Sequence, residues 1–174
     1  LTTAGRRRLI FPFLTSSILG AICYHPPMLR LALALILLLP ISVAMADITG
    51  KPRVVDGDTI HIGKTKIRLH GIDAPEMKQT CRTSKGKEQK CGVLAMQALE
   101  RLVKGQDVTC KGDTRDRYKR LIAVCYVGPF NINEQMVTDG WAMAYRKYSK
   151  DYVSEETLAK SRREGLWRGT FEPP

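Results

Sequence analysis

The stretch that decides the fold runs from Val54 to Glu76 and reads VVDGDTIHIGKTKIRLHGIDAPE. Along its middle, polar and apolar residues alternate with the period of half-buried β-strands, and Gly63-Lys64 provides a tight turn between them. Four carboxylates flank this predicted hairpin: Asp56, Asp58, Asp73 and Glu76. We therefore predict two short strands that bring two acidic loops to the same end of a sheet.

One arginine, Arg68, lies between the two acidic clusters. Carboxylate oxygens are ligands for hard cations, and a guanidinium group can hold a phosphate by paired hydrogen bonds. The segment Asp56–Thr59 taken alone is a weak signal and favours a plain acidic turn. Its combination with Asp73–Glu76 at this spacing favours a site that binds a metal and a phosphate.

Several ordered motifs resemble the staphylococcal nuclease (thermonuclease) family. They are DGDT at 56–59, RLHGIDAPE at 68–76, DRYKR at 116–120 and NEQMVTDGWA at 133–142. The resemblance covers roughly 48–167. One position departs from the family pattern, because Lys119 stands where the family usually has glycine, and this puts the geometry of that loop in question.

The rest of the chain gives an α+β layout of five strands and three helices. Strands are expected at 50–55, 60–62, 66–72, 106–111 and 120–127, and helices from 92 to just before 105, at 132–138 and at 153–163. The segment 77–90 is polar and lysine-rich and is expected to be a surface loop, whereas 141–145 is expected to be extended or turn-like. The resemblance implies that the strands close into a five-stranded OB-fold (oligonucleotide/oligosaccharide-binding) Greek-key barrel.

Residues 1–46 are expected to lie outside the folded domain, which we assign to 47–174. The apolar run LALALILLL follows Arg30 and precedes Ala44-Met45-Ala46, which is typical of a signal peptide cleaved after Ala46. Met28 is a natural start, so residues 1–27 can be upstream translation. The apolar run is shorter than the ~20 residues of a membrane span, and an uncleaved anchor is the alternative. We expect export to the periplasm or beyond, with no stable membrane span after cleavage.

Charge and cysteine content agree with an exported protein that meets a polyanion. The chain carries a net charge of +11, and removal of 1–46, with its four arginines and no acid, leaves 24 basic and 17 acidic residues, or +7. Beyond Cys23, four cysteines allow three pairings. Local geometry favours Cys81–Cys91 and Cys110–Cys125, the latter because a hairpin centred near Arg117-Tyr118 places its cysteines opposite each other. Four buried thiols in a cytosolic protein are the alternative.

The resemblance also implies a role for each residue of the site. It makes Asp58, Asp73 and the backbone carbonyl of Ala74 ligands of Ca²⁺, with Asp56 in the outer shell or bound through water. It makes Glu76 the general base, and Arg68 and Arg120 the pair that grips the scissile phosphate, with Arg117 as a substitute for Arg120. Tyr118 and Tyr148 would contact the terminal nucleotide.

The resulting hypothesis is an exported, monomeric, calcium-dependent thermonuclease-like endonuclease. It would hydrolyse single- and double-stranded DNA and RNA to 3′-phosphate ends. Two alternatives remain open: a non-catalytic nucleic-acid-binding OB module, and a nuclease-like accessory protein of envelope polysaccharide metabolism. The set of carboxylates and arginines argues against a pure binding module, which needs no such set.

Overall fold

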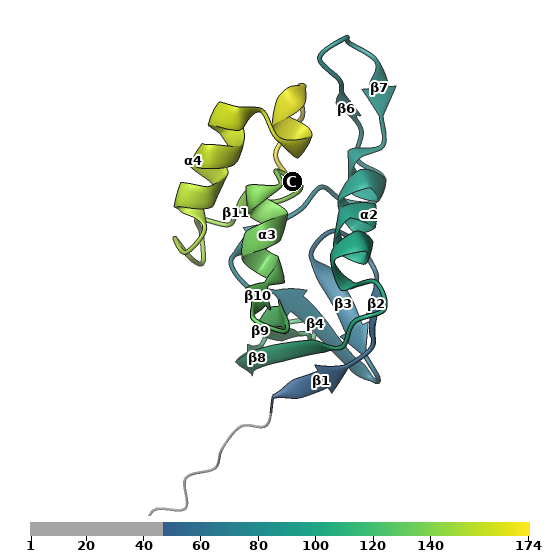
Figure 1. Cartoon of the computed structure of the whole chain (residues 1–174), viewed down its shortest axis with the longest axis vertical. Helices are drawn as coiled ribbons and strands as arrows, with labels where there is room; N and C mark the ends of the chain where they lie inside the picture. The colour runs from purple at the N-terminus through teal and green to yellow at the C-terminus, as the bar shows by residue number, and fades with distance from the viewer. Residues whose placement is uncertain (1–46) are drawn as a thin grey trace, which may run out of the picture. The chain divides into compact units, whose positions relative to one another are not determined.

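The computed structural model describes residues 47–174 (Figure 1). The predicted signal segment at 1–46, including the start at Met28, lies outside the described residues. No helix within 47–174 has both the length and the apolar character needed to cross a membrane.

The described chain is built around one strongly curled sheet. Its neighbours follow the order β1-β8-β9-β4-β3-β2, with β10 also paired to β9; β4 and β9 run parallel and the other pairs are antiparallel. The strands are β1 (Ile48–Gly50), β2 (Pro52–Val54), β3 (Thr59–Ile62), β4 (Thr65–Leu69), β8 (Val108–Arg115), β9 (Leu121–Val127) and β10 (Phe130–Asn131). The predicted strand 50–55 is thus two short pieces, which pair with different neighbours and are separated by Lys51 alone.

Three α-helices and one 3₁₀ helix complete the described part: α2 (Cys91–Val103), α3 (Ile132–Thr138), α4 (Val153–Arg162) and η1 (Gly165–Arg168). The prediction of an α+β chain with three helices is therefore confirmed. The bounds of α3 agree with the sequence because Asn131 is a strong N-cap, whose side chain accepts hydrogen bonds from the amides of Asn133 and Glu134. Ile60, Ile67, Leu99 and Met136 are fully buried, so α2, α3 and the sheet share one core.

The predicted strand at 66–72 ends early. Strand β4 stops at Leu69, and β5 (Ile72–Asp73) pairs instead with β11 (Met143–Ala144). Gly71 lies between them with φ of +73°, a left-handed conformation that few other residues adopt. This kink turns Asp73 away from the sheet path and places it beside the segment that follows α3.

The predicted surface loop 77–90 has structure of its own. It contains a two-stranded hairpin, β6 (Cys81–Arg82) and β7 (Glu88–Gln89), which stands beside η1 in Figure 1. Arg82 also pairs with Thr170 through two reciprocal backbone hydrogen bonds of 2.9 Å each. The sequence did not indicate this hairpin because its strands are short, polar and held by a distant segment.

The cysteines behave differently in the two predicted pairs. The register of β8 and β9 places Cys110 directly opposite Cys125, and the two form a disulfide with their Cα atoms 4.0 Å apart. The predicted Cys81–Cys91 bridge is not formed, and both residues are buried free thiols. The hairpin register opposes Cys81 to Gln89, and the Cys91 thiol donates to the carbonyl of Gln79 at 3.6 Å.

Candidate active site

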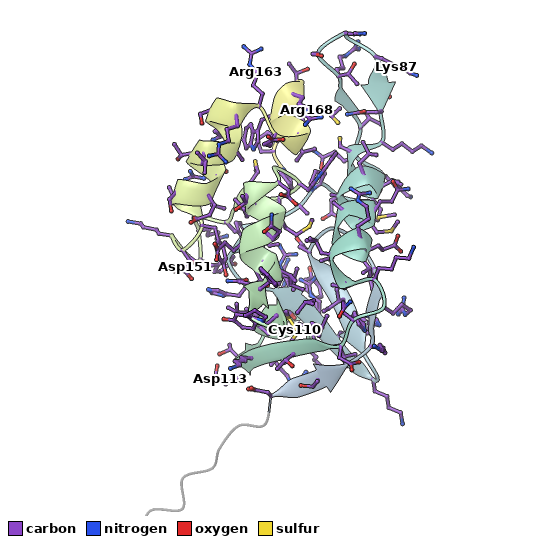
Figure 2. The ribbon with its side chains drawn as sticks, viewed as in Figure 1. Lys87, Cys110, Asp113, Asp151, Arg163 and Arg168 are labelled. Carbon is purple, nitrogen blue, oxygen red and sulfur yellow. A yellow bond between two sulfur atoms is a disulfide. The ribbon has the colours of Figure 1, made fainter. Side chains whose placement is uncertain are left out.

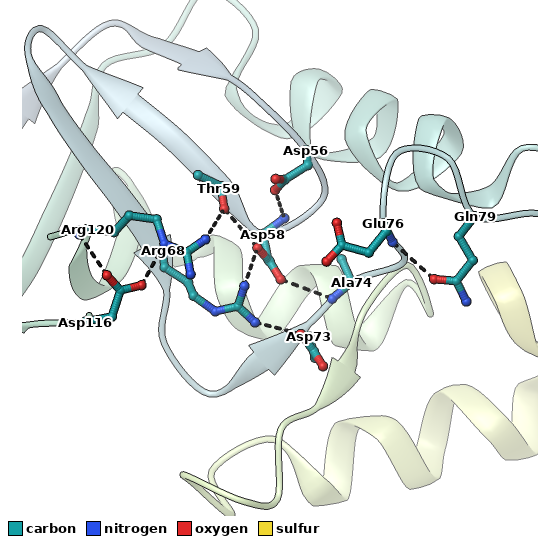
Figure 3. Close-up of polar contacts among 10 residues, drawn as sticks. All are labelled: Asp56, Asp58, Thr59, Arg68, Asp73, Ala74, Glu76, Gln79, Asp116 and Arg120. Atoms are coloured by element: carbon teal, nitrogen blue, oxygen red, sulfur yellow. Dashed lines mark hydrogen bonds and ion pairs between the residues drawn. The ribbon is translucent and has the colours of Figure 1, made fainter. Parts of the chain in front are cut away.

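Strands β3, β4 and β5 bring two predicted metal ligands onto one guanidinium group. Arg68 donates to Asp58 at 3.0 Å and to Asp73 at 2.6 Å, and Asp58 also accepts from the amide of Ala74 at 3.3 Å (Figure 3). Asp56 lies behind Asp58 and accepts a hydrogen bond from its amide at 3.1 Å. The two acidic loops therefore meet at one end of the sheet, with Arg68 between them.

Burial makes Asp58 an unusual carboxylate, because only 5 % of the residue is exposed. Burial raises its pKa from 3.8 to about 7, with Asp56 adding to the rise, while Arg68 and the hydrogen bonds from Ala74 and Thr59 oppose it. Burial acts to lower the pKa of Arg68, but Asp58 and Asp73 outweigh it and raise that pKa. Burial thus disfavours the charged form of Asp58 in spite of its contact with Arg68.

Replacing Asp58 by asparagine should stabilise the metal-free protein above neutral pH. Because the pKa of Asp58 is higher in the folded than in the unfolded protein, its contribution to the free energy of unfolding falls as pH rises between about 4 and 7. Asp58→Asn removes this loss, and we expect a gain of roughly 1–4 kcal/mol at pH 8 and almost none at pH 4. Urea titrations with chelator at both pH values measure it; an equal effect at the two values would contradict the assignment.

Arg120 reaches the same site from the loop that joins β8 and β9. Its guanidinium donates to the hydroxyl of Thr59 at 3.3 Å, and Thr59 donates to Asp58 at 3.0 Å. Asp116 fixes this arginine by accepting from its Nε at 2.7 Å and from its backbone amide at 2.9 Å. Burial acts to raise the pKa of Asp116, but the hydrogen bonds from Arg120 outweigh it and lower that pKa, so the pair stays charged.

Lys119 adopts a backbone conformation that normally favours glycine. Its φ is +64°, in the left-handed region, and its amide donates to the carbonyl of Asp116 at 2.9 Å. The amide of Asp116 in turn donates to the carbonyl of Arg120 at 3.0 Å, which closes the turn. The substitution therefore strains the backbone locally while leaving Arg120 directed at the site.

The Lys119→Gly substitution is expected to stabilise the protein by about 0.5–1 kcal/mol. A non-glycine residue in the left-handed region costs roughly 1–2 kcal/mol, and the added freedom of glycine in the unfolded chain offsets about 0.5–1 kcal/mol of that. Denaturant unfolding measures the difference. Lys147→Gly is the control, because Lys147 has an ordinary φ and its replacement should lower stability; equal losses in both variants would refute the strain.

Glu76 lies on the turn that leaves the buried segment Ala74-Pro75, and its side chain is exposed. Gln79 holds this turn from both sides: its amide donates to the carbonyl of Glu76 at 2.7 Å, and its side-chain oxygen accepts from the amide of Glu76 at 3.1 Å. Helix α2 packs closely behind, since a Cβ at Gly92 would lie 1.9 Å from the carbonyl oxygen of Glu76. Figure 3 shows the Glu76 carboxylate directed back toward Asp58 and Ala74.

The two tyrosines predicted to contact the terminal nucleotide, Tyr118 and Tyr148, are both exposed. The Tyr118 ring is 61 % exposed, and the guanidinium carbons of Arg117 and Arg120 lie 4.8 and 5.5 Å from its centre. Tyr148 is 67 % exposed and packs edge-on against Tyr145, with ring centres 4.9 Å apart. Exposed aromatic rings beside cations are suited to stacking on bases without sequence preference.

Four residues of this network were not assigned to the site from the sequence: Thr59, Gln79, Asp116 and Tyr145. Tyr145 lies 5.8 Å from the guanidinium carbon of Arg68, so it connects Tyr148 to the centre of the site. Its segment is held by Arg146, which contacts the buried carboxylate of Glu156 on α4. Asp116 and Thr59 belong to quoted motifs, so motif membership was the available signal; Gln79 offered none.

The ligand atoms that the site offers are oxygens, the type that a hard cation prefers. Asp58 and Asp73 together neutralise the Arg68 guanidinium group, and every ligand atom expected at the site is oxygen. Within 47–174, no cluster of three or more His, Cys, Asp or Glu side chains is arranged to hold a metal ion. The side chains thus supply two carboxylates, so a backbone carbonyl or water has to complete any coordination shell.

Carboxylates and two guanidinium groups from separate segments therefore meet at one end of a curled sheet. In a comparison with known proteins, residues 66–169 match the family described as staphylococcal nuclease homologue. The chain belongs to this family and is a staphylococcal nuclease-like enzyme.

Similar proteins come from several bacteria. A micrococcal nuclease of Shigella flexneri is 34 % identical over 80 % of this chain and 84 % of its own length. An uncharacterized endonuclease of Escherichia coli O157:H7 is 36 % identical over 72 % of this chain and 80 % of its own length. The succinoglycan biosynthesis protein ExoI of Rhizobium meliloti is 32 % identical over 80 % of this chain and 75 % of its own length.

Proposed function

We propose that this protein is an exported, calcium-dependent endonuclease that hydrolyses DNA and RNA to 3′-phosphate ends. The observation that carries the proposal is the convergence of Arg68 and Arg120 on the Asp58–Thr59 corner. Two guanidinium groups from separate strands and loops meet there beside two carboxylates. Such a cluster suits a phosphodiester, whose oxygens accept bidentate hydrogen bonds and whose single negative charge increases in the five-coordinate transition state.

We infer that the curled sheet is the five-stranded OB barrel that the family resemblance implies. Strands β1 and β2 are separated only by Lys51, and they pair with β8 and β3 at opposite ends of the strand order. Taken as halves of one bent strand, they join the two edges of the sheet. OB barrels present nucleic-acid-binding loops at their surface, which suits a loop-built site.

The two arginines have hydrogen-bond donors left for substrate. Each guanidinium has five N–H groups; Arg68 directs two of them at carboxylates, and Arg120 directs two at Asp116 and Thr59. The remaining donors would bind the phosphate oxygens and stabilise the charge that builds up in the five-coordinate transition state. Asp58 and Asp116 hold the Arg68 and Arg120 guanidinium groups in place before substrate arrives.

Glu76 would act as general base. Its carboxylate accepts a proton from a water molecule as the water oxygen bonds to phosphorus; the bond from phosphorus to the 5′-oxygen breaks, and the leaving 5′-oxygen takes a proton from solvent water. The phosphate then remains on the 3′ side. The Gln79 bridge and the close packing of Gly92 fix the backbone from which Glu76 projects.

Asp58, Asp73 and the carbonyl of Ala74 would hold the cation, with Asp56 behind them. A bound Ca²⁺ would contribute Lewis-acid stabilisation of the phosphate oxygens. Family members are generally calcium-dependent. The Cys110–Cys125 disulfide supports export, because disulfides persist in oxidising compartments, and it ties together the strands that carry the Arg120 loop.

Calcium titration of oligonucleotide cleavage tests the proposal directly. We expect a labelled single-stranded DNA to be cut only when Ca²⁺ is added, with half-maximal activity on the order of 10⁻⁴–10⁻³ M as for extracellular calcium sites, and chelator to abolish cutting. End-group analysis should find 3′-phosphates. Binding without cutting at any Ca²⁺ concentration would favour a binding module, and a preference for acidic polysaccharide would favour the role that the name of the Rhizobium relative suggests.

A further inference from the structure

A basic groove lies outside the site described above, between the β6–β7 hairpin and the segment Arg163–Thr170. It has a volume of about 500 Å³, and its lining includes Arg82 from the hairpin and Arg163 and Arg168 from the other side. Figure 2 shows the labelled Arg163 and Arg168 at the same end of the molecule as Lys87. Three arginines from two distant parts of the sequence thus share one cavity.

The hairpin that forms one wall is strongly basic. Segment 77–90 contains five basic residues, Lys78, Arg82, Lys85, Lys87 and Lys90, against a single acid, Glu88. Within 47–174, Arg168 has an ion pair to Glu164 at 3.1 Å, whereas Arg82 and Arg163 have none. The groove therefore has positive charge that the described residues leave largely uncompensated.

The walls of the groove are well ordered by backbone contacts. The hairpin tip is closed by hydrogen bonds between Thr83 and Lys87 and between Gly86 and Thr83, each of 2.9 Å. Arg82 pairs with Thr170 in both directions, which joins the two walls. The lining arginines are thereby held on a fixed frame, which reduces the entropy lost when a ligand binds.

The Glu76 turn and one wall of the groove belong to the same short stretch of chain. Gln79 binds the backbone of Glu76 with its side-chain oxygen and donates from its side-chain nitrogen to the carbonyl of Glu172 at 2.5 Å. Arg82 follows Glu76 closely in the chain, so their Cα atoms cannot be more than about 20 Å apart. A strand that leaves the catalytic site past Glu76 can therefore reach the groove within a few nucleotides.

We propose that this groove is a second nucleic-acid subsite, which holds the phosphate backbone of a single strand beyond the scissile bond. The inference rests on the proposed function and adds a preference for long substrates over short ones. Arginines on facing walls can each contact a phosphate, and such contacts are independent of base sequence.

The test compares a 20-nucleotide single strand with a trinucleotide as substrates. The hairpin variant Arg82→Gln and the opposite-wall variant Arg163→Gln/Arg168→Gln change only residues that line the groove. The double variant should raise KM for the 20-mer by about tenfold at low salt, and the single variant by about threefold. Cleavage of the trinucleotide should change less than twofold. Lys64→Gln/Lys66→Gln removes the same charge as the opposite-wall variant and is the matched control, because Lys64 is exposed on the turn between β3 and β4 and Lys66 is exposed on β4.

A second measurement uses binding in a Glu76→Gln background, so that substrate stays intact. The salt dependence of 20-mer affinity should become shallower by about 0.7 in log–log slope for each phosphate that the variant no longer neutralises. The subsite proposal would be overturned if the groove variants had the parent's KM for the 20-mer, or if the control variant showed an equal effect. Stronger competition by an acidic polysaccharide than by DNA would also overturn it. If the parent cuts neither substrate yet binds the 20-mer through these residues, the proposed function fails and the groove stands.

Discussion

Glu76→Gln should lower kcat by about 10²–10⁴-fold with little change in affinity for a single-stranded oligonucleotide, because the amide cannot take the proton of the attacking water. The side chain is exposed and has the same shape as the amide that replaces it, so stability should hardly change. Single-turnover cleavage at saturating enzyme measures the chemical step, and anisotropy with the same labelled oligonucleotide measures binding.

Glu100→Gln provides the matched control for this loss. Glu100 is an exposed carboxylate on α2, outside the described network. Its replacement should leave kcat unchanged within experimental error. A Glu76→Gln enzyme that retains most of its kcat would remove Glu76 from the role of base, while leaving the arginine and carboxylate cluster as a phosphate-binding site.

Arg68→Lys should lower kcat/KM by about 10²–10³-fold even though the positive charge is retained. Arg68 spans Asp58 and Asp73 with two nitrogens of one planar group, and lysine carries a single ammonium that cannot span both carboxylates and still donate to phosphate. The loss should appear mainly in kcat, because the affected charge develops in the transition state.

Two comparisons separate catalysis from packing in the Arg68 variant. Arg53→Lys changes an exposed arginine on β2 whose side chain, within residues 47–174, bonds only to His61, and it should leave cleavage unaltered. Denaturant unfolding of Arg68→Lys measures how much the free energy of unfolding falls when lysine replaces arginine beside the buried Asp58. A variant with parental kcat/KM would show that charge alone suffices and that the forked geometry is not used.

Local sequence was enough to place the main elements of the chain. Helix α3 follows from the Asn131 cap and the apolar spacing after it, and the 59–69 hairpin follows from alternation around Gly63-Lys64. The opposition of Cys110 and Cys125 follows from strand register alone. These features depend on residues near one another in the chain, where pattern and propensity act directly.

The outer parts of the site depended on contacts that no local pattern encodes. Asp116 and Thr59 hold Arg120, and Tyr145 reaches Arg68 only because β11 pairs with β5. Gln79 bridges Glu76 to Glu172, residues 96 positions apart by their numbers. Their roles come from the docking of segments that the sequence separates widely.

The sequence by itself determined the chemistry of this protein: which carboxylates and arginines are present, at what spacing, and on which short strands. The tertiary structure alone decided that Asp58 is buried against Arg68, that Lys119 takes a left-handed conformation, and that the 77–90 segment is a hairpin bound to Thr170 rather than a free loop. The physical reason is that burial, backbone strain and cross-chain pairing are properties of packed segments, whereas residue type and spacing are properties of the chain before it folds.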